Sequence, residues 1–277
     1  MRYLFIILLV TVAAFAQCGD SDWWCTPYTA PAFPDDSLIL YYNMDSLTAS
    51  FEYYDFSGRG NHGTNYSVAD TVGYGPGCTA PRGGYFDNTA YTVCIDTVPA
   101  LFYQVVVFAW VYRISEQSLG GIISYGDSPW VLADGGSGTV KWYGRLASWV
   151  NVSAAVPNSE WHSVAGTYDK AAGTYNWRIY VDGVVVDSTT VIGNLSPHAG
   201  YDYQLQVGGY QATLNWHGYI DEPRVYAIGG SNAQMDSLVS NLHNYNSISG
   251  ACAAAPVGGA KIRGAYIDGK LQTWRTQ

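Results

Sequence analysis

Residues 177–187 read WRIYVDGVVVD, two runs of β-branched and aromatic residues on either side of Asp182-Gly183. Both central positions of a tight two-residue hairpin turn need positive φ angles, which Asp and Gly tolerate. The stretch therefore predicts two antiparallel strands joined at Asp182-Gly183. A second run, residues 105–112 (VVVFAWVY), is apolar at odd and even positions alike, which indicates a central strand covered on both faces.

Outward from these runs, short β-prone segments recur and are separated by turn residues. The other predicted strands are residues 38–44, 85–86, 91–95, 121–125, 140–143, 163–168, 204–208 and 219–226. Pro223 cannot donate to a strand ladder, so it predicts an edge, a bulge or a bend in the last of them. Only residues 232–245 have helical spacing, with Ser231 or Asn232 as the N-cap and an apolar face of Met235, Leu238, Val239 and Leu242. The pattern predicts an all-β fold: a two-sheet antiparallel β-sandwich, or jelly roll, with one short C-terminal helix.

The composition of the 277-residue chain excludes several classes of protein. Charged residues make up 13% and aromatic residues 15%, with a net charge of -9. A chain with so many aromatic residues does not have the composition of a disordered protein. The negative charge offers no basic surface to neutralise phosphates, so we expect no nucleic-acid partner.

The two ends of the chain differ from its middle. Residues 1–16 have a positive start, an apolar run and a small-residue cleavage site (Ala14-Phe15-Ala16), which is typical of a secretory signal peptide. We therefore expect a secreted, extracellular protein with no membrane span, comprising an N-terminal arm at 17–36, one domain at 37–248 and a linker with a basic arm at 249–277. Within this arm, Asp268-Gly269 predicts another hairpin.

Five cysteines follow the predicted signal peptide, and secretion makes disulfide bonds the default expectation. We predict Cys78 with Cys94, and Cys25 or Cys18 with Cys252, although pairing cannot be deduced from sequence alone. The odd number leaves one thiol over, either unpaired or bonded to another chain. Secretion also makes three N-x-S/T sequons eligible for N-glycosylation, at Asn65, Asn151 and Asn194. Asn194 is the weaker site because Pro197 follows its serine.

Several phrases, in matching order over residues 38–245, resemble the laminin-G-like, concanavalin A-like lectin/glucanase jelly roll family. The phrases are LYYNMD at 40–45, DFSGRGNHGT at 55–64, FD at 86–87, FAWV at 108–111, WHSVAGTYD at 161–169, IYVDG at 179–183 and GYIDEPRVY at 218–226. Pro223 departs from the valine usual in the last phrase. The resemblance implies two stacked antiparallel sheets, in agreement with the strand pattern.

The same resemblance implies a structural calcium ion near the loop that begins at Asp55, with Asp221 completing the site. Calcium takes several carboxylate and carbonyl oxygens, which such a loop can supply. The alternative is that Asp55 and Asn61 only form hydrogen bonds within a tight glycine turn.

The sequence contains no recognisable set of catalytic residues. Glycan hydrolysis needs two carboxylates about 5 to 9.5 Å apart, and the chain has none of the E-x-D-x-E strand motif of hydrolytic relatives. His62 and His162 lie inside family phrases, and we interpret them as hydrogen-bonded structural residues, as we do the isolated His198, His217 and His243. We expect the protein not to be an enzyme.

Aromatic side chains are the remaining candidates for function, because flat rings stack on sugars. The main glycan-stacking candidates are Trp130, Trp142, Tyr143, Trp149 and Trp216, and Tyr201, Tyr203 and Tyr210 are further loop aromatics that could line a groove. For each one the alternative is a place in the core.

The leading hypothesis is a secreted, non-enzymatic binding or adhesion protein that recognises glycans or extracellular proteins. The alternative is a structural subunit of an extracellular filament or coat, which self-associates through its terminal arms. A polysaccharide hydrolase is the third hypothesis, and it lacks its carboxylate motif.

Overall fold

A computed structural model shows two separate units. It describes residues 37–42, 44, 52–66, 83–89, 91–95, 101, 103–126, 129–196, 204–211, 214–249, 262–267 and 270–275. The main unit lies within residues 29–251, and the small unit holds residues 1–28 and 252–277. Within the described part of the chain no helix is long and apolar enough to cross a membrane.

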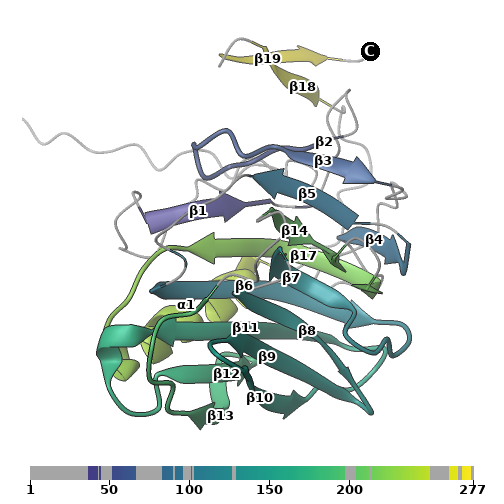
Figure 1. Cartoon of the computed structure of the whole chain (residues 1–277). Coiled ribbons are helices and arrows are strands. Elements are labelled where there is room, and N and C mark those ends of the chain that lie inside the picture. The colour runs from purple at the N-terminus through teal and green to yellow at the C-terminus, as the bar shows by residue number, and fades with distance from the viewer. Residues whose placement is uncertain are drawn as a thin grey trace, which may run out of the picture. The chain divides into compact units, whose positions relative to one another are not determined.

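The main unit consists of two sheets of mostly antiparallel strands, which confirms the predicted β-sandwich (Figure 1). The first, seven-stranded sheet has the order β1-β17-β6-β11-β12-β13, with β4 also paired to β17. Its strands are β1 (Leu38–Tyr41), β4 (Gly84–Asp87), β6 (Gln104–Arg113), β11 (Trp161–Asp169), β12 (Trp177–Val181), β13 (Val184–Thr189) and β17 (His217–Tyr226). The 3-10 helix η3 (Lys170–Ala172) follows β11.

The second, ten-stranded sheet has the order β10-β9-β8-β7-β14-β5-β3-β2, with the β15–β16 pair joined to β7. Its strands are β2 (Glu52–Tyr53), β3 (Gly63–Tyr66), β5 (Tyr91–Ile95), β7 (Gly121–Tyr125), β8 (Trp130–Gly136), β9 (Thr139–Arg145), β10 (Trp149–Ala155), β14 (Leu205–Val207), β15 (Gly209–Tyr210) and β16 (Leu214–Asn215). No strand was predicted in the segments that form β2, β3, β8, β10, β15 and β16.

The hairpin predicted at Asp182-Gly183 forms. Val181 of β12 pairs with Val184 of β13, and Asp182 and Gly183 between them have φ angles of 51° and 77°. Pro223 lies where the pairing of β17 with β6 shifts between Asp221 and Arg224, so the predicted irregularity is a bulge.

The core between the sheets is rich in tryptophan. Trp142 of β9 stacks on Trp177 of β12 with ring centroids 4.7 Å apart and planes 12° apart, and both rings are fully buried. Gly166 of β11 lies beneath this pair, where an added Cβ would approach Trp142 to 2.3 Å. Glycine at this position therefore lets the seven-stranded sheet approach the indole ring.

A buried ion pair joins the two sheets at one end of the sandwich. Arg113 of β6 donates from Nη1 to Asp134 Oδ1 of β8 at 2.9 Å, and both side chains are fully buried. Arg113 also donates to the carbonyls of Thr139 and Val156 and to Asn158. Loss of either charged partner would leave the other buried without its counter-charge.

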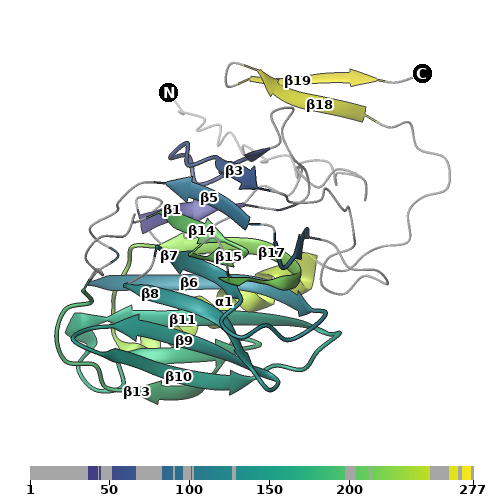
Figure 2. The ribbon, with the colours of Figure 1, turned by 45° about the vertical axis from the view of Figure 1, so that its right-hand side comes forward.

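Helix α1 (Asn232–Ser249) covers the outer face of the seven-stranded sheet. Ser231 and Gln234 form reciprocal hydrogen bonds at its start, which confirms Ser231 as the N-cap. The predicted apolar face is buried: Met235, Leu238, Val239 and Leu242. In Figure 2, β8, β9 and β10 lie toward the viewer and α1 lies behind them, against the other sheet.

The small unit contains the predicted C-terminal hairpin. β18 (Ile262–Ile267) and β19 (Lys270–Arg275) pair antiparallel, with Ile267 opposite Lys270. The predicted signal peptide at 1–16, the arm at 17–36, the linker and Cys18, Cys25, Cys78 and Cys252 lie outside the described residues. The same holds for the Cys94 side chain, so the predicted disulfides stay predictions.

Candidate functional site

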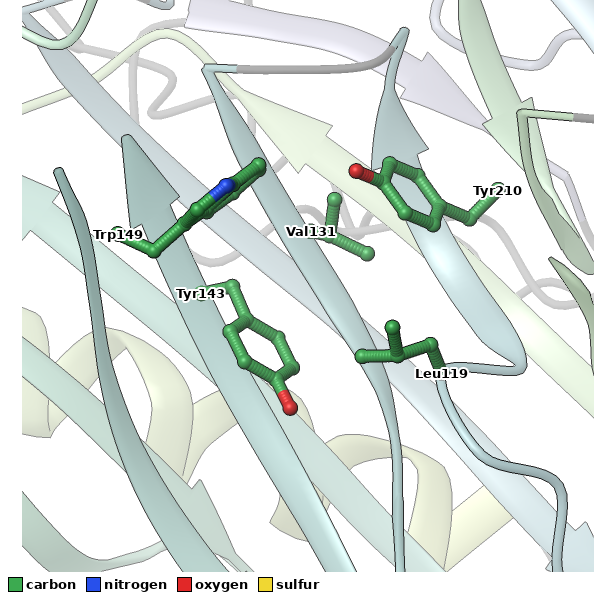
Figure 3. A pocket seen from close by; sticks show the side chains of 5 residues that line it. All are labelled: Leu119, Val131, Tyr143, Trp149 and Tyr210. Atoms are coloured by element: carbon green, nitrogen blue, oxygen red, sulfur yellow. The ribbon is translucent and has the colours of Figure 1, made fainter. Parts of the chain in front are cut away.

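An open pocket lies on the outer face of the ten-stranded sheet, on the side away from the core. Its volume is about 320 Å³. Five side chains from β8, β9, β10, β15 and the loop before β7 line it: Leu119, Val131, Tyr143, Trp149 and Tyr210. In Figure 3, Val131 lies between Trp149 and Tyr210, and Tyr143 and Leu119 lie below these three residues.

Strand alternation explains why these side chains face outward. Side chains along a strand point alternately to the two faces of a sheet. Trp142 points into the core, so its neighbour Tyr143 points out; Trp130 and Val131 divide in the same way. The register then aligns the outward positions, since Tyr143 lies opposite Val131 of β8 and opposite Asn151 of β10.

The pocket combines flat ring surface with positive charge. The ring of Trp149 is 42% exposed and meets that of Tyr143 edge-on, with centroids 6.3 Å apart. Lys141 Nζ lies 5.9 Å from the Tyr143 ring centroid, and Arg145 Cζ lies 5.9 Å from that of Trp149. The arrangement can offer an apolar stacking surface beside two hydrogen-bond donors.

Three of the predicted glycan-stacking residues are core residues instead. Trp130, Trp142 and Trp216 are fully buried, so no sugar can reach their rings, and the prediction is wrong for them. Trp130 and Trp142 donate their indole N–H to the carbonyls of Leu101 and Thr167, each at 3.2 Å. No strand was predicted around Trp130 or directly before Trp216, and the predicted strand at 140–143 did not by itself show which of its faces meets the core.

Tyr143 and Trp149 do line the pocket, and their role in stacking on a glycan stays a prediction. Tyr210 also contributes, although it is largely buried. Tyr201 and Tyr203 lie outside the described residues. Val131 was not among the predicted site residues, although the short apolar run at 130–133 (WVLA) is itself a signal of a buried strand. Leu119 gave no such signal, because it lies in a loop with a φ angle of 64°.

The loop of the predicted calcium site is held together by Asp55 itself. Its carboxylate accepts N–H groups of Tyr41, Ser57 and Asn61 and the Ser57 hydroxyl, at 2.7 to 3.1 Å. These four donors occupy the lone pairs that a cation would need, so Asp55 in this arrangement does not fit a calcium ligand. Asp221 accepts the N–H of Glu222 at 2.9 Å. Among the described residues no three His, Cys, Asp or Glu side chains gather to hold a metal. Calcium gains no support here and stays a prediction.

The histidines of the described segments have structural partners, as predicted. The Nδ1 atoms of His62, His217 and His243 bond to the Asp55 N–H and to the hydroxyls of Ser115 and Ser163 respectively. His162 Nδ1 lies 2.8 Å from Asp182 Oδ2. His198 lies outside the described residues.

The His162–Asp182 pair shifts the titration of both groups. The hydrogen bond to Asp182, against the effect of burial, raises the pKa of His162, and the charge of Glu160 adds to the rise. Burial alone would raise the pKa of Asp182, but the hydrogen bond and charge of His162 lower it overall. The pair lies at the hairpin turn, on the opposite sheet from the pocket, so we assign it to stability.

Two of the described glutamates, Glu222 and Glu116, have structural partners. Glu222, at the β17 bulge, contacts Arg224, whose guanidinium lies 4.3 Å from the Tyr41 ring centroid. Burial raises the pKa of Glu222. Glu116 accepts the N–H of Ser137 at 2.8 Å. The five residues that line the pocket include no carboxylate, so the pocket lining lacks the acid–base pair of a glycosidase.

Comparison with known proteins assigns the chain to a family. It belongs to the concanavalin A-like lectin/glucanase superfamily, because the model of a laminin-G-like family of that description matches residues 73–234. This confirms the resemblance identified from the sequence. No curated protein sequence matches the chain.

Solved structures show the same fold. Domain 4 of AbnA, an extracellular arabinanase from Geobacillus stearothermophilus solved with arabinotriose, matches with a TM-score of 0.56 and 18% identity, over 75% of this chain and 98% of that domain. A Trypanosoma rangeli sialidase variant matches with a TM-score of 0.54 and 14% identity, over 83% of this chain. The match spans only 37% of the sialidase. At these identities the likeness shows the fold alone.

Proposed function

We propose that this protein is a non-enzymatic, secreted carbohydrate-binding domain, and that the pocket around Tyr143 and Trp149 holds the sugar. The single observation that supports this most is the exposed Trp149 ring at an open pocket whose other linings are Tyr143, Tyr210 and two aliphatic side chains. The C–H face of a sugar ring packs on such a surface, and tryptophan and tyrosine lose little conformational entropy in presenting it.

Polar groups at the rim would provide orientation. Small-ligand sites combine a mostly apolar lining with a few placed polar groups. Lys141 and Arg145 lie beside the two rings, and both are hydrogen-bond donors suited to sugar hydroxyls. Since the lining carries no carboxylate pair, the pocket favours binding over hydrolysis.

A glycan array tests the proposal on protein that carries no N-linked glycan, with neutral oligosaccharides that include arabinotriose, which was solved with domain 4 of AbnA. We expect binding that Trp149→Ala and Tyr143→Ala reduce at least about tenfold, the loss of roughly 1.4 kcal/mol. Tyr103→Ala is the matched control, because Tyr103 is 50% exposed and does not line the pocket. A chelator in parallel wells tests calcium separately. Absence of binding to every glycan, or hydrolysis of any of them, would contradict the proposal.

Assembly into a filament or coat is the second candidate, and two observations favour it. The C-terminal hairpin is a two-stranded sheet in a unit of its own, and such hairpins are marginally stable alone. β13 ends the seven-stranded sheet and exposes Val184 and Val186, so its edge could accept another strand. Light scattering on the full chain and on a chain that lacks residues 249–277 tests this. A monomer in both cases would rule assembly out.

A further inference from the structure

We propose that Asn151 carries an N-linked glycan whose first sugar stacks on Trp149 and closes the pocket to other carbohydrate. The inference deepens the proposed function, since it concerns regulation of the same pocket and rests on that pocket accepting sugar. In this proposal, the sugar that occupies the pocket is attached to the protein itself.

The register places Asn151 beside the exposed ring of Trp149 and the half-buried ring of Tyr143. Asn151 follows Trp149 by two residues in β10, so the two side chains emerge from the same face. Asn151 also lies directly opposite Tyr143 of β9. Side chains in such cross-strand positions have Cβ atoms about 4.5 to 5.5 Å apart. A sugar attached to Asn151 Nδ2 therefore starts next to the two rings that line the pocket.

Asn151 is also available for modification. Its side chain is exposed, and within the described part of the chain no hydrogen bond engages it. The sequon continues with Val152, which is buried in the core, and Ser153, whose N–H donates to Asp187 Oδ2 at 3.1 Å. The intervening residue therefore anchors the strand, while the acceptor asparagine faces out.

The other sequons lack this setting. Asn194 Oδ1 already accepts a hydrogen bond from Lys170 Nζ at 2.6 Å, and its segment contributes nothing to the pocket. The side chain of Asn65 lies outside the described residues. Of the described sequons, Asn151 is the one with a tryptophan two residues before it on the same strand face.

The chemistry is a group transfer from a polyprenyl-diphosphate-linked oligosaccharide in the secretory pathway. Nδ2 of Asn151 attacks the anomeric carbon of the first sugar, where an N–C bond forms and the C–O bond to the diphosphate breaks. The electron pair leaves with the diphosphate, and a base takes one amide proton. The pocket volume, about 320 Å³, is at the small end of ligand sites, so one resident sugar would occupy space that another saccharide needs.

The test uses the full chain from a eukaryotic secretory host, with its glycans trimmed to one N-acetylglucosamine. Peptide mass spectrometry measures occupancy of Asn151. N-bromosuccinimide, which oxidises accessible indoles, then reports on Trp149. Ser153→Ala is the matched control, because it removes the sequon and keeps both Asn151 and the backbone N–H to Asp187. We expect oxidation of Trp149 to be several-fold slower in the glycosylated protein than in Ser153→Ala.

Thermal unfolding provides a second readout. We expect the glycosylated protein to melt about 2–4 °C above Ser153→Ala, the shift that a modest stacking contact gives in a domain of this size. The difference should vanish when Trp149→Ala is present in both backgrounds. An unoccupied Asn151, equal oxidation rates, or a melting difference that survives Trp149→Ala would overturn the inference. None of these readouts uses an added saccharide. A failed glycan array would therefore refute the proposed function, whereas the oxidation and melting measurements would still test the contact between the Asn151 glycan and Trp149.

Discussion

The outer face of one sheet is covered by a helix, whereas the outer face of the other carries an open pocket. On the seven-stranded sheet, α1 covers the strands: His243 stacks on Trp110 with centroids 5.3 Å apart, and Asp236 accepts from the Tyr180 hydroxyl at 2.9 Å and pairs with Arg178. On the ten-stranded sheet, β9 and β10 present Tyr143 and Trp149 at an open pocket. The difference teaches that a single helix decides which face is available for binding.

The difference between the two outer faces is also visible in the burial patterns of the strands. β6, under α1, is buried at nearly every position, whereas β9 alternates regularly between buried and partly exposed residues. A strand covered on both faces is apolar at every position, and one with a solvent face alternates. Four predictions test the contrast, from the largest effect on stability to the smallest.

Trp142→Ala should have the largest effect, because it empties the core behind the pocket. Trp142 is fully buried and stacked on Trp177, and such truncations cost about 3–5 kcal/mol. Chemical denaturation measures this loss of unfolding free energy. The neighbouring Tyr143→Ala, on the outward face, is the matched comparison and should cost much less. Equal losses would contradict the division of β9 into inner and outer faces.

Leu238→Ala should weaken the helix that covers the seven-stranded sheet. Leu238 is fully buried in α1, and a leucine truncation of this kind costs about 2–4 kcal/mol. Hydrogen exchange should show faster exchange in α1 than in β8–β10. Ser237→Ala, on the exposed side of the helix, is the control. Unchanged stability in Leu238→Ala would mean that α1 is dispensable as a cover.

Asp182→Asn should change the pH dependence of stability at the hairpin turn beside α1. The raised pKa of His162 stabilises the fold below its ordinary pKa of about 6.5 and loses that effect as pH rises through the folded value. The lowered pKa of Asp182 stabilises the fold above about 3.9 and loses that effect as pH falls through the folded value.

The pair therefore contributes most between these limits, at about pH 5–6. Asp182 is 43% exposed, so the contribution is at most about 1 kcal/mol. Unfolding free energies of Asp182→Asn and the parent, measured from pH 4 to 9, should differ most near pH 5–6, and the difference should shrink as His162 loses its proton toward pH 9. Asparagine keeps the left-handed turn position, which makes the substitution conservative. A difference that stays constant with pH would show that the ion pair has no role.

Trp149→Ala should have the smallest effect on stability and the largest on binding. The ring is exposed at the sheet surface, so its removal should change unfolding free energy by about 0.5 kcal/mol or less. Denaturation and glycan binding measured on the same preparation separate the two effects. A large loss of stability would show that Trp149 belongs to the fold rather than to a binding surface.

The sequence predicted more of the fold than of the site, for a physical reason. The Asp182-Gly183 turn, the run at 105–112 and the apolar face of α1 can each be recognised from residues adjacent in the sequence. The choice between Trp142 as core and Tyr143 as surface depends instead on which face of β9 meets the opposite sheet, and this is settled by the register with β8 and β10. The prediction missed those two partner strands, so it grouped buried and exposed rings together.

The most direct test of the binding account is a titration followed by the indole N–H resonances of the tryptophans, using the oligosaccharide that the array ranks strongest. Trp149 is assigned by Trp149→Phe, and Trp110, buried beneath α1, is the internal reference. The account predicts that the Trp149 resonance moves to saturation while that of Trp110 stays in place. A shift at Trp110 with Trp149 unmoved would contradict it.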